Sequence, residues 1–133
     1  MNLCADSWFL IKLSENDTTA METIKQVTQG KDRLIVPSVT LVELTRKMIR
    51  DGSGLENVDK LLGSLRTSSK ITVTSLDEEL AVSSGKISAE YSMPSIDSIV
   101  AATALRTECR VLLSKDTHFD RFSKSTEIKK QCW

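Results

Sequence analysis

The sequence predicts an α/β protein: a three-layer α/β/α sandwich with a mostly parallel central sheet, formed by one domain over residues 1–133. Short runs of apolar and β-branched residues alternate with segments of helical periodicity, as in folds that cover a parallel sheet with helices on both faces. The run "RVLLS" (110–114) has a continuous apolar centre, which is typical of a buried parallel strand. No linker, repeat or low-complexity segment divides the chain, and its length suffices for one hydrophobic core.

Local patterns predict the elements in chain order. A first strand over 3–5 ends at Asp6, and a helix follows with Asp6 or Ser7 near its cap. Gly30 ends the next helix, and Ser38 caps a later one directly after the second strand. The expected helices otherwise cover 17–29, 38–50, 55–65, 77–91 and the segment after Pro94, with a helical turn over 117–122. The expected strands otherwise cover 34–38, 70–76 and 110–114, with an edge strand within 125–130.

Composition limits the possible functions. No apolar run is long enough to span a bilayer and the N-terminus has no basic region, so we expect a cytoplasmic protein without a membrane partner. Three scattered cysteines without a CxxC pair argue against a disulfide framework and a thiolate zinc site. The 18 basic residues balance 18 acidic ones, which weakens a nucleic-acid interpretation. The balance does not exclude a nucleic-acid-binding protein, because acids gathered at one site would leave a surplus of basic residues on the rest of the surface. Net charge does not report that distribution.

Four acidic residues come from separate places that meet at one edge of the predicted sheet, beyond the carboxyl ends of its strands. They are Asp6 after the first strand, Glu43 in the helix after the second, Asp97 at the head of "SIDSIVAATAL" (95–105), and Asp116 beyond the strand at 110–114. Like charges gathered in this way destabilise a fold unless a cation offsets them. Carboxylate oxygens suit Mg²⁺ or Mn²⁺, so the pattern indicates a metal site.

Each acid also has a purely structural interpretation. Asp6 is a possible helix cap, Glu43 a partner of Arg46 or Lys47, Asp97 a favourable charge at a helix N-terminus, and Asp116 the start of an Asx turn. Ser95 after Pro94 is an equally good cap, which makes Asp97 unnecessary for capping.

At these residues the chain resembles the PIN-domain family, and in size and layout its VapC-type toxins. The matching segments are "CADSWFLIKL", "VPSVTLVEL", "SIDSIVAATAL" and "LLSKDTHF". The resemblance implies a metal-dependent endoribonuclease that hydrolyses RNA phosphodiester bonds, with Mg²⁺ or Mn²⁺ held by Asp6, Glu43, Asp97 and Asp116. It also implies a homodimer and a cognate antitoxin that lies over the active site.

The resemblance assigns further residues. Ser114 resembles a hydroxyl residue that orders the site by hydrogen bonding, and Ser7 stands where the family often has another. Some members carry an additional acid two residues after the last one, where this chain has His118; Asp120 is a possible replacement. Trp8, next to the first acid, is expected to be buried between helices rather than to stack on a base.

Other functions stay open at this point. One is an RNA-processing PIN nuclease without a toxin role, and another is a non-catalytic PIN-fold binding module. A third is a receiver-type phosphoacceptor, which requires an acidic pair after the first strand and a phosphorylatable Asp after a central one. After the first strand this chain has Asp6 alone and no acidic pair. The segment "TVTSLDEE" is a poor match to a strand followed by a phosphorylatable Asp.

Overall fold

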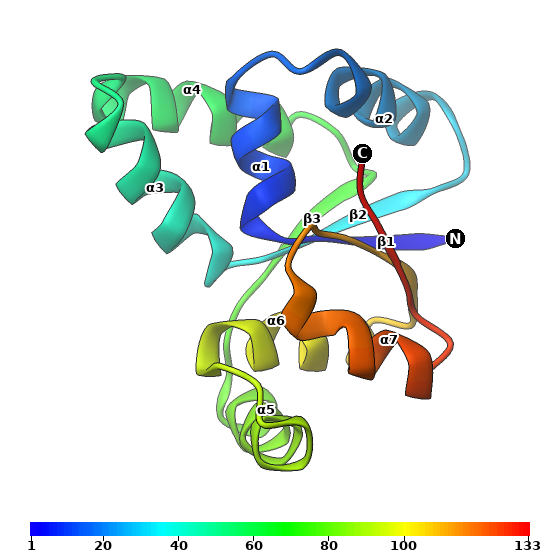
Figure 1. Cartoon of the computed structure of the whole chain (residues 1–133). Coiled ribbons are helices and arrows are strands. Elements are labelled where there is room, and N and C mark those ends of the chain that lie inside the picture. The colour runs from blue at the N-terminus through cyan, green and yellow to red at the C-terminus, as the bar shows by residue number, and fades with distance from the viewer.

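One parallel sheet forms the centre of the computed structural model, which describes residues 1–133 (Figure 1). Its strands are β1 (Asn2–Ala5), β2 (Arg33–Pro37), β3 (Ile71–Thr74), β4 (Cys109–Leu113) and β5 (Lys129–Gln131). They lie in the order β3-β2-β1-β4-β5, and every neighbouring pair is parallel. The predicted α/β sandwich is therefore confirmed, and its sheet is parallel throughout.

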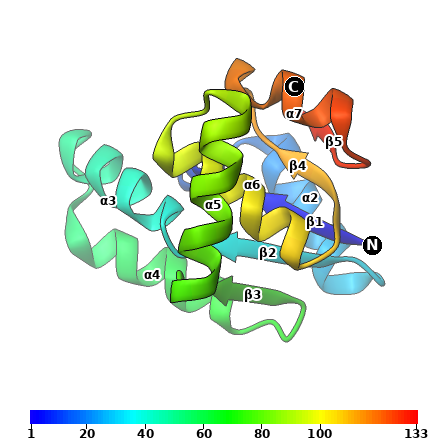
Figure 2. The same ribbon diagram turned by 90° about the horizontal axis from the view of Figure 1, so that it is seen from below.

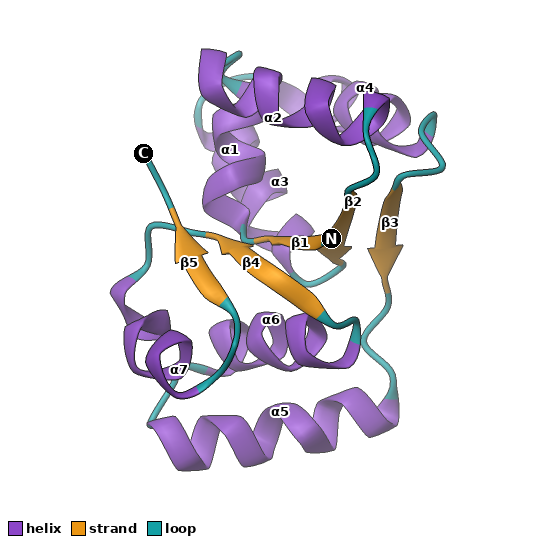
Figure 3. Ribbon diagram, turned by 90° about the vertical axis from the view of Figure 1, so that its right-hand side faces the viewer, coloured by secondary structure: helices purple, strands orange, loops and turns teal.

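Helices cover both faces of this sheet (Figure 3). One face carries α1 (Ser7–Ser14), α2 (Thr18–Gln29), α3 (Thr40–Arg50) and α4 (Gly54–Arg66). The other carries α5 (Glu78–Tyr91), α6 (Ser95–Arg106), the 3₁₀ turn η1 (Thr117–Phe119) and α7 (Asp120–Ser125). Figure 2 shows α5 in front of α6. Helix α6 packs on the strands, and α5 packs on α6. None of the helices has the length and apolar character needed to cross a bilayer.

The central strands β1, β2 and β4 are mainly apolar on both faces because each face packs against its own layer of helices. In β1, Leu3 and Ala5 belong to the core beneath α1–α4, whereas Cys4 belongs to the core beneath α5–α7. In β4, Leu113 belongs to the core beneath α1–α4 and Leu112 to the core beneath α5–α7. Successive side chains of a strand point to opposite faces, so two buried faces require a continuous apolar run.

Helix α6 lies across the centre of the sheet, where it contacts β1, β2 and β4. Its small side chains allow this close approach: Ala101 and Ala104 are fully buried, as is Val100. This packing places the first turn of α6, which contains Asp97, beside the ends of the central strands.

The two serine caps expected from the sequence are wrong. The amide of Ser38 donates to the carbonyl of Thr74, 2.9 Å away, so Ser38 prolongs the pairing of β2 with β3 and the helix begins only at Thr40. In α6 the cap position belongs to Pro94, whose extended backbone has φ −54° and ψ 149°, and Ser95 is already the first helical residue. Neither helix has a side-chain cap.

The C-terminal elements are shifted from their expected positions. The hydroxyls of Ser125 and Thr126 donate to the carbonyl of Phe122 over 3.3 Å and 3.0 Å, which lengthens the helical turn as far as Ser125. The edge strand therefore begins only at Lys129, although the sequence placed it within 125–130.

Candidate active site

Two of the predicted site residues directly follow neighbouring strands. Asp6 comes after β1, and its amide donates to the carbonyl of Leu113 in β4 over 3.1 Å. Ser114 comes after β4, and its amide donates to the carbonyl of Gln131 in β5 over 3.1 Å. The ladder of the sheet thus fixes the backbone of both residues at the carboxyl edge of the sheet.

A short hydrogen bond joins these two residues. The Ser114 hydroxyl donates to Asp6 Oδ2 over 2.6 Å, across 108 positions of the sequence. The same Ser114 oxygen accepts the amide of Asp116 over 3.0 Å. Ser114 is fully buried, so its bond with Asp6 is shielded from water. Ser114 therefore orders two of the acids at once.

Asp6 is a buried carboxyl group in an unfavourable environment for charge. Only 4% of its surface is exposed, and this burial raises its pKa from 3.8 to about 6. The hydrogen bond from Ser114 acts in the opposite direction on this pKa, and the negative charges of Asp97 and Glu43 raise it further. Asp6 occupies the N-cap position of α1, as the sequence predicted, but its side chain makes no cap bond, so helix capping alone does not explain the buried carboxyl group.

Glu43 faces the site from the first turn of α3. The Ser7 hydroxyl at the start of α1 donates to Glu43 Oε2 over 3.1 Å. Lys47, one of the two cations expected to pair with Glu43, instead forms an ion pair with Asp51 at 3.2 Å. No ion pair joins Glu43 to Arg46. The salt-bridge interpretation of Glu43 is therefore wrong, and its bond with Ser7 ties α3 to α1.

Asp97 and Asp116 share one histidine. His118 Nδ1 lies 2.8 Å from Asp97 Oδ2 and 3.0 Å from Asp116 Oδ1. Burial raises the pKa of Asp97, as does the charge of Asp116, while the hydrogen bond with His118 lowers it. The same hydrogen bond from Asp97, together with the negative charge of Asp116, raises the pKa of His118. The three side chains form an electrostatically coupled group.

The structural interpretations of Asp97 and Asp116 hold alongside these contacts. Asp116 Oδ1 accepts the amide of His118 over 2.9 Å, which is the expected turn and begins η1. Asp97 lies in the first turn of α6, where the helix dipole favours negative charge. Turn formation and helix polarity therefore explain why acids are tolerated here, but not why the two converge on one imidazole.

The donor set fits a hard divalent cation. One ligand atom each from Asp97, Asp116 and His118 lies within 4.8 Å of the others. Glu43 lies near enough for its charge to raise the pKa of both Asp6 and Asp97, and the charge of Asp97 also raises the pKa of Asp6. Mg²⁺ and Mn²⁺ prefer oxygen ligands, and two of the carboxyl groups here, Asp6 and Asp97, are buried with raised pKa values that a cation would lower.

Two residues considered from the sequence lie apart from this cluster. Asp120 forms an ion pair with Lys130 of β5, whose ammonium group also donates to the backbone carbonyl of Asp116 over 3.3 Å. Trp8, which was expected to be buried between helices, is only partly buried and packs against the C-terminal Trp133 with ring centroids 4.8 Å apart. His118, whose role the sequence left undefined, is the residue that the structure adds to the cluster.

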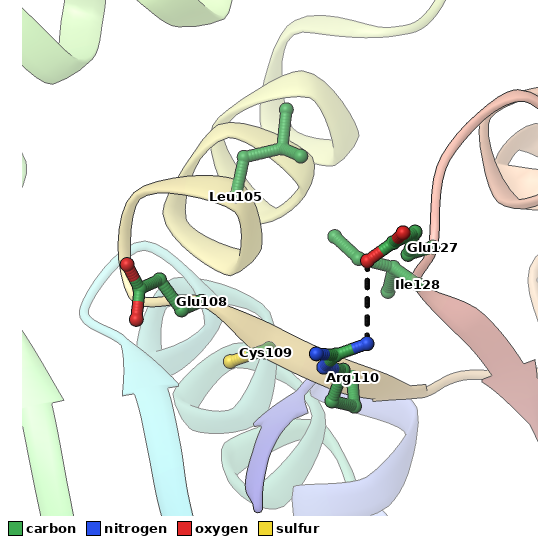
Figure 4. A pocket seen from close by; sticks show the side chains of 6 residues that line it. All are labelled: Leu105, Glu108, Cys109, Arg110, Glu127 and Ile128. Carbon is green, nitrogen blue, oxygen red and sulfur yellow. Dashed lines mark hydrogen bonds and ion pairs between the residues drawn. The ribbon is translucent and has the colours of Figure 1, made fainter.

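A separate pocket of about 510 Å³ lies near the opposite end of β4 (Figure 4). Its lining includes Arg110 and Glu127, which form an ion pair at 3.2 Å, drawn as a dashed line in the figure. None of the four acids lines this pocket, and its one basic side chain, Arg110, is already paired with Glu127. The acidic cluster is therefore the stronger candidate for the functional site.

Comparisons with known structures support the fold. The fold is similar to VapBC2 from Rickettsia felis, solved with a DNA fragment from the promoter, with a TM-score of 0.77 and 14% identity over 100% of this chain and 99% of that one. It is also similar to DNA-bound VapBC from Salmonella typhimurium, with a TM-score of 0.71 and 18% identity over 100% and 98% of the two chains.

A third similar structure is VapC20 from Mycobacterium tuberculosis, a toxin that cleaves the sarcin-ricin loop, with a TM-score of 0.71 and 12% identity over 96% of this chain and 98% of that one. No match is found among curated protein sequences. The sequence profile of the PIN domain matches residues 3–125, nearly the whole chain. The chain therefore belongs to the PIN domain family.

Proposed function

We propose that this protein is a divalent-metal-dependent endoribonuclease that hydrolyses RNA phosphodiester bonds, and that it is the toxin of a toxin–antitoxin pair. The observation that carries the proposal is the buried Asp6, whose pKa is raised to about 6 beside three further acids from separate elements. Membership of the PIN domain family and the similarity to toxin structures support the same conclusion.

Each site residue has a role in this proposal. Asp6, Glu43, Asp97 and Asp116 hold Mg²⁺ or Mn²⁺, which when bound activates a water molecule and stabilises the leaving oxygen of a phosphodiester. Ser114 fixes the carboxyl of Asp6 and the backbone of Asp116. Ser7 fixes the carboxyl of Glu43. These hydroxyls keep the acids oriented before substrate arrives.

RNA is the proposed substrate because one similar structure is described as a sarcin-ricin loop cleaving toxin. The RNA backbone requires cations near the cluster, and the exposed Lys115 is adjacent to Asp116 in the sequence. The exposed Arg46 lies one helical turn from Glu43 on α3. We infer that these side chains and Lys12 contact phosphates, whereas Lys47 is occupied by Asp51.

An antitoxin and a second copy of the chain are the proposed protein partners, and the cytoplasm is the proposed location. Similar structures contain VapBC complexes. An apolar surface of α3, close in sequence to Glu43, includes Leu41, Val42 and Ile49. Val42 is 63% exposed and Ile49 49% exposed, so this surface is open to a partner. Sedimentation of the purified chain, alone and with the product of an adjacent gene, tests both associations.

The enzymatic proposal is tested by incubating a set of structured RNAs with the protein and Mg²⁺ or Mn²⁺. We expect cleavage by the parent chain and a loss on the order of 100-fold or more in Asp97→Asn. Asp59→Asn, an exposed change on α4, is the matched control and keeps the parent rate. Equal cleavage by Asp97→Asn and the parent contradicts the proposal.

A toxin and an RNA-processing nuclease differ in their effect on cells. If the protein is a toxin, its induction arrests growth, and co-expression of its antitoxin restores it. Growth that continues despite active, carboxylate-dependent cleavage in vitro instead favours the processing enzyme. Induction of Asp97→Asn is the control that separates catalysis from nonspecific effects of overproduction.

A further inference from the structure

The side chain of His118 lies within the acidic cluster. Its Nδ1 atom is 2.8 Å from Asp97 Oδ2 and 3.0 Å from Asp116 Oδ1, so it faces both carboxylates. Asp97 comes from α6 and Asp116 from the loop after β4. The imidazole therefore sits at the point where two elements bring their carboxylates together.

The backbone around His118 holds the ring in this position. The amide of His118 donates to Asp116 Oδ1 over 2.9 Å, and this turn starts η1. Asp116 is itself held through its amide by the buried Ser114. The ring is 54% exposed, which leaves it room to reorient Nδ1 from its two acceptors toward a cation that they share.

We propose that His118 is a direct ligand of the divalent ion, which gives the site one imidazole nitrogen among its carboxylate oxygens. This inference rests on the proposed function, since it assumes that Asp97 and Asp116 are metal ligands. One donor atom from each of the three residues already lies within 4.8 Å of the others, a spacing that one ion spans with modest adjustment.

The consequence is a preference among metals. Mg²⁺ binds oxygen ligands almost exclusively, whereas Mn²⁺, a transition-metal ion, also accepts an imidazole nitrogen beside its oxygen ligands. A site with His118 as ligand therefore favours Mn²⁺ over Mg²⁺ more strongly than a site made only of carboxylates. Replacing His118 with Asp supplies an oxygen donor in its place and removes the basis of that preference.

The same contacts are compatible with a different role, in which His118 only joins the two acids and leaves when an ion enters. The two roles differ in one observable property. A coordinated imidazole places a nitrogen nucleus next to the paramagnetic Mn²⁺, whereas a displaced imidazole does not. Because His118 is the only histidine of the chain, an imidazole signal has a single source.

The experiment is pulsed electron paramagnetic resonance of the full chain, prepared without a histidine tag and loaded with Mn²⁺ alone. We expect nitrogen modulation from a coordinated imidazole in the parent protein, and its loss in His118→Asp while Mn²⁺ stays bound. Competition titrations provide a second measurement. The ratio of Mg²⁺ to Mn²⁺ dissociation constants falls on the order of tenfold in His118→Asp.

The outcomes separate this inference from the proposed function. Bound Mn²⁺ without imidazole modulation in the parent overturns the role of His118 and leaves the metal-dependent nuclease intact. Modulation that persists in His118→Asp, or an unchanged metal preference, also overturns it. Failure of the parent to bind Mn²⁺ or Mg²⁺ at all contradicts both. Tyr91→Phe, which removes only a hydroxyl bonded to Ser125, controls for general effects of substitution and keeps the parent signal.

Discussion

At the scale of single residues, Asp6 is the group whose position is most unfavourable without a cation. Its pKa is raised to about 6 by burial, against 3.8 in the unfolded chain. The folded state therefore holds its proton more tightly than the unfolded state does, and the free energy of unfolding falls as pH rises between these two values. Above about pH 6 the loss is complete, on the order of 3 kcal/mol at most.

A first prediction follows from this cost. In metal-free protein at pH 7.5, Asp6→Asn raises the free energy of unfolding, because the amide accepts the Ser114 hydroxyl without carrying a charge. At pH 4 the gain disappears, since Asp6 is then protonated in the parent. Urea unfolding of both proteins at the two pH values measures it. A gain that is equal at both pH values contradicts the burial of an unfavourable charge.

A second prediction concerns Ser114, which bonds both Asp6 and Asp116. Ser114→Ala removes the hydroxyl that orients these ligands, so Mn²⁺ affinity falls by about tenfold or more. The rise in melting temperature on adding Mn²⁺ is therefore smaller in the variant than in the parent. Ser83→Ala, an exposed change on α5, leaves that rise unchanged. An undiminished rise in Ser114→Ala contradicts its ordering role.

A third prediction concerns Asp120, which was a possible additional acid. Because its carboxylate is paired with Lys130, we expect Asp120→Asn to change Mn²⁺ affinity by no more than about twofold. Isothermal titration of the variant measures this affinity. A loss comparable to that of Asp97→Asn shows instead that Asp120 leaves Lys130 to join the metal.

At the scale of elements, α6 determines where Asp97 lies. Ala101 is fully buried against the sheet, so a larger side chain there must push the helix outward. Ala101→Leu is expected to destabilise the protein by about 1–3 kcal/mol. It also weakens Mn²⁺ binding by displacing Asp97. Leu105→Ala, at the exposed end of the same helix, is the control and does neither. Unchanged stability in Ala101→Leu contradicts the close packing of α6.

The element types were predictable from the sequence because strands buried on both faces and amphipathic helices differ in their apolar patterns. The first residues of helices were less predictable. Ser38 and Ser95 are of a residue type that often caps helices, but the backbone around them does not place either one at a cap position. The amide of Ser38 is used by β3, and Pro94 already occupies the cap position of α6. Such tertiary hydrogen bonds leave no local signal.

At the scale of the whole molecule, strand order decides which distant residues meet. The central position of β1 between β2 and β4 brings Asp6 beside Ser114, although 108 positions separate them. The sequence predicted that the four acids share an edge of the sheet, because the carboxyl ends of parallel strands lie together. It did not reveal His118 between Asp97 and Asp116, because that contact depends on one side-chain orientation in η1.

The central claim is that the acids at this edge hold a divalent cation, and calorimetric titration with Mn²⁺ tests it most directly. The account predicts saturable binding to the parent chain, equal binding to Asp59→Asn, and affinity reduced by on the order of 100-fold in Asp97→Asn. A binding curve of Asp97→Asn that coincides with that of the parent, or a parent that does not bind Mn²⁺, contradicts the claim.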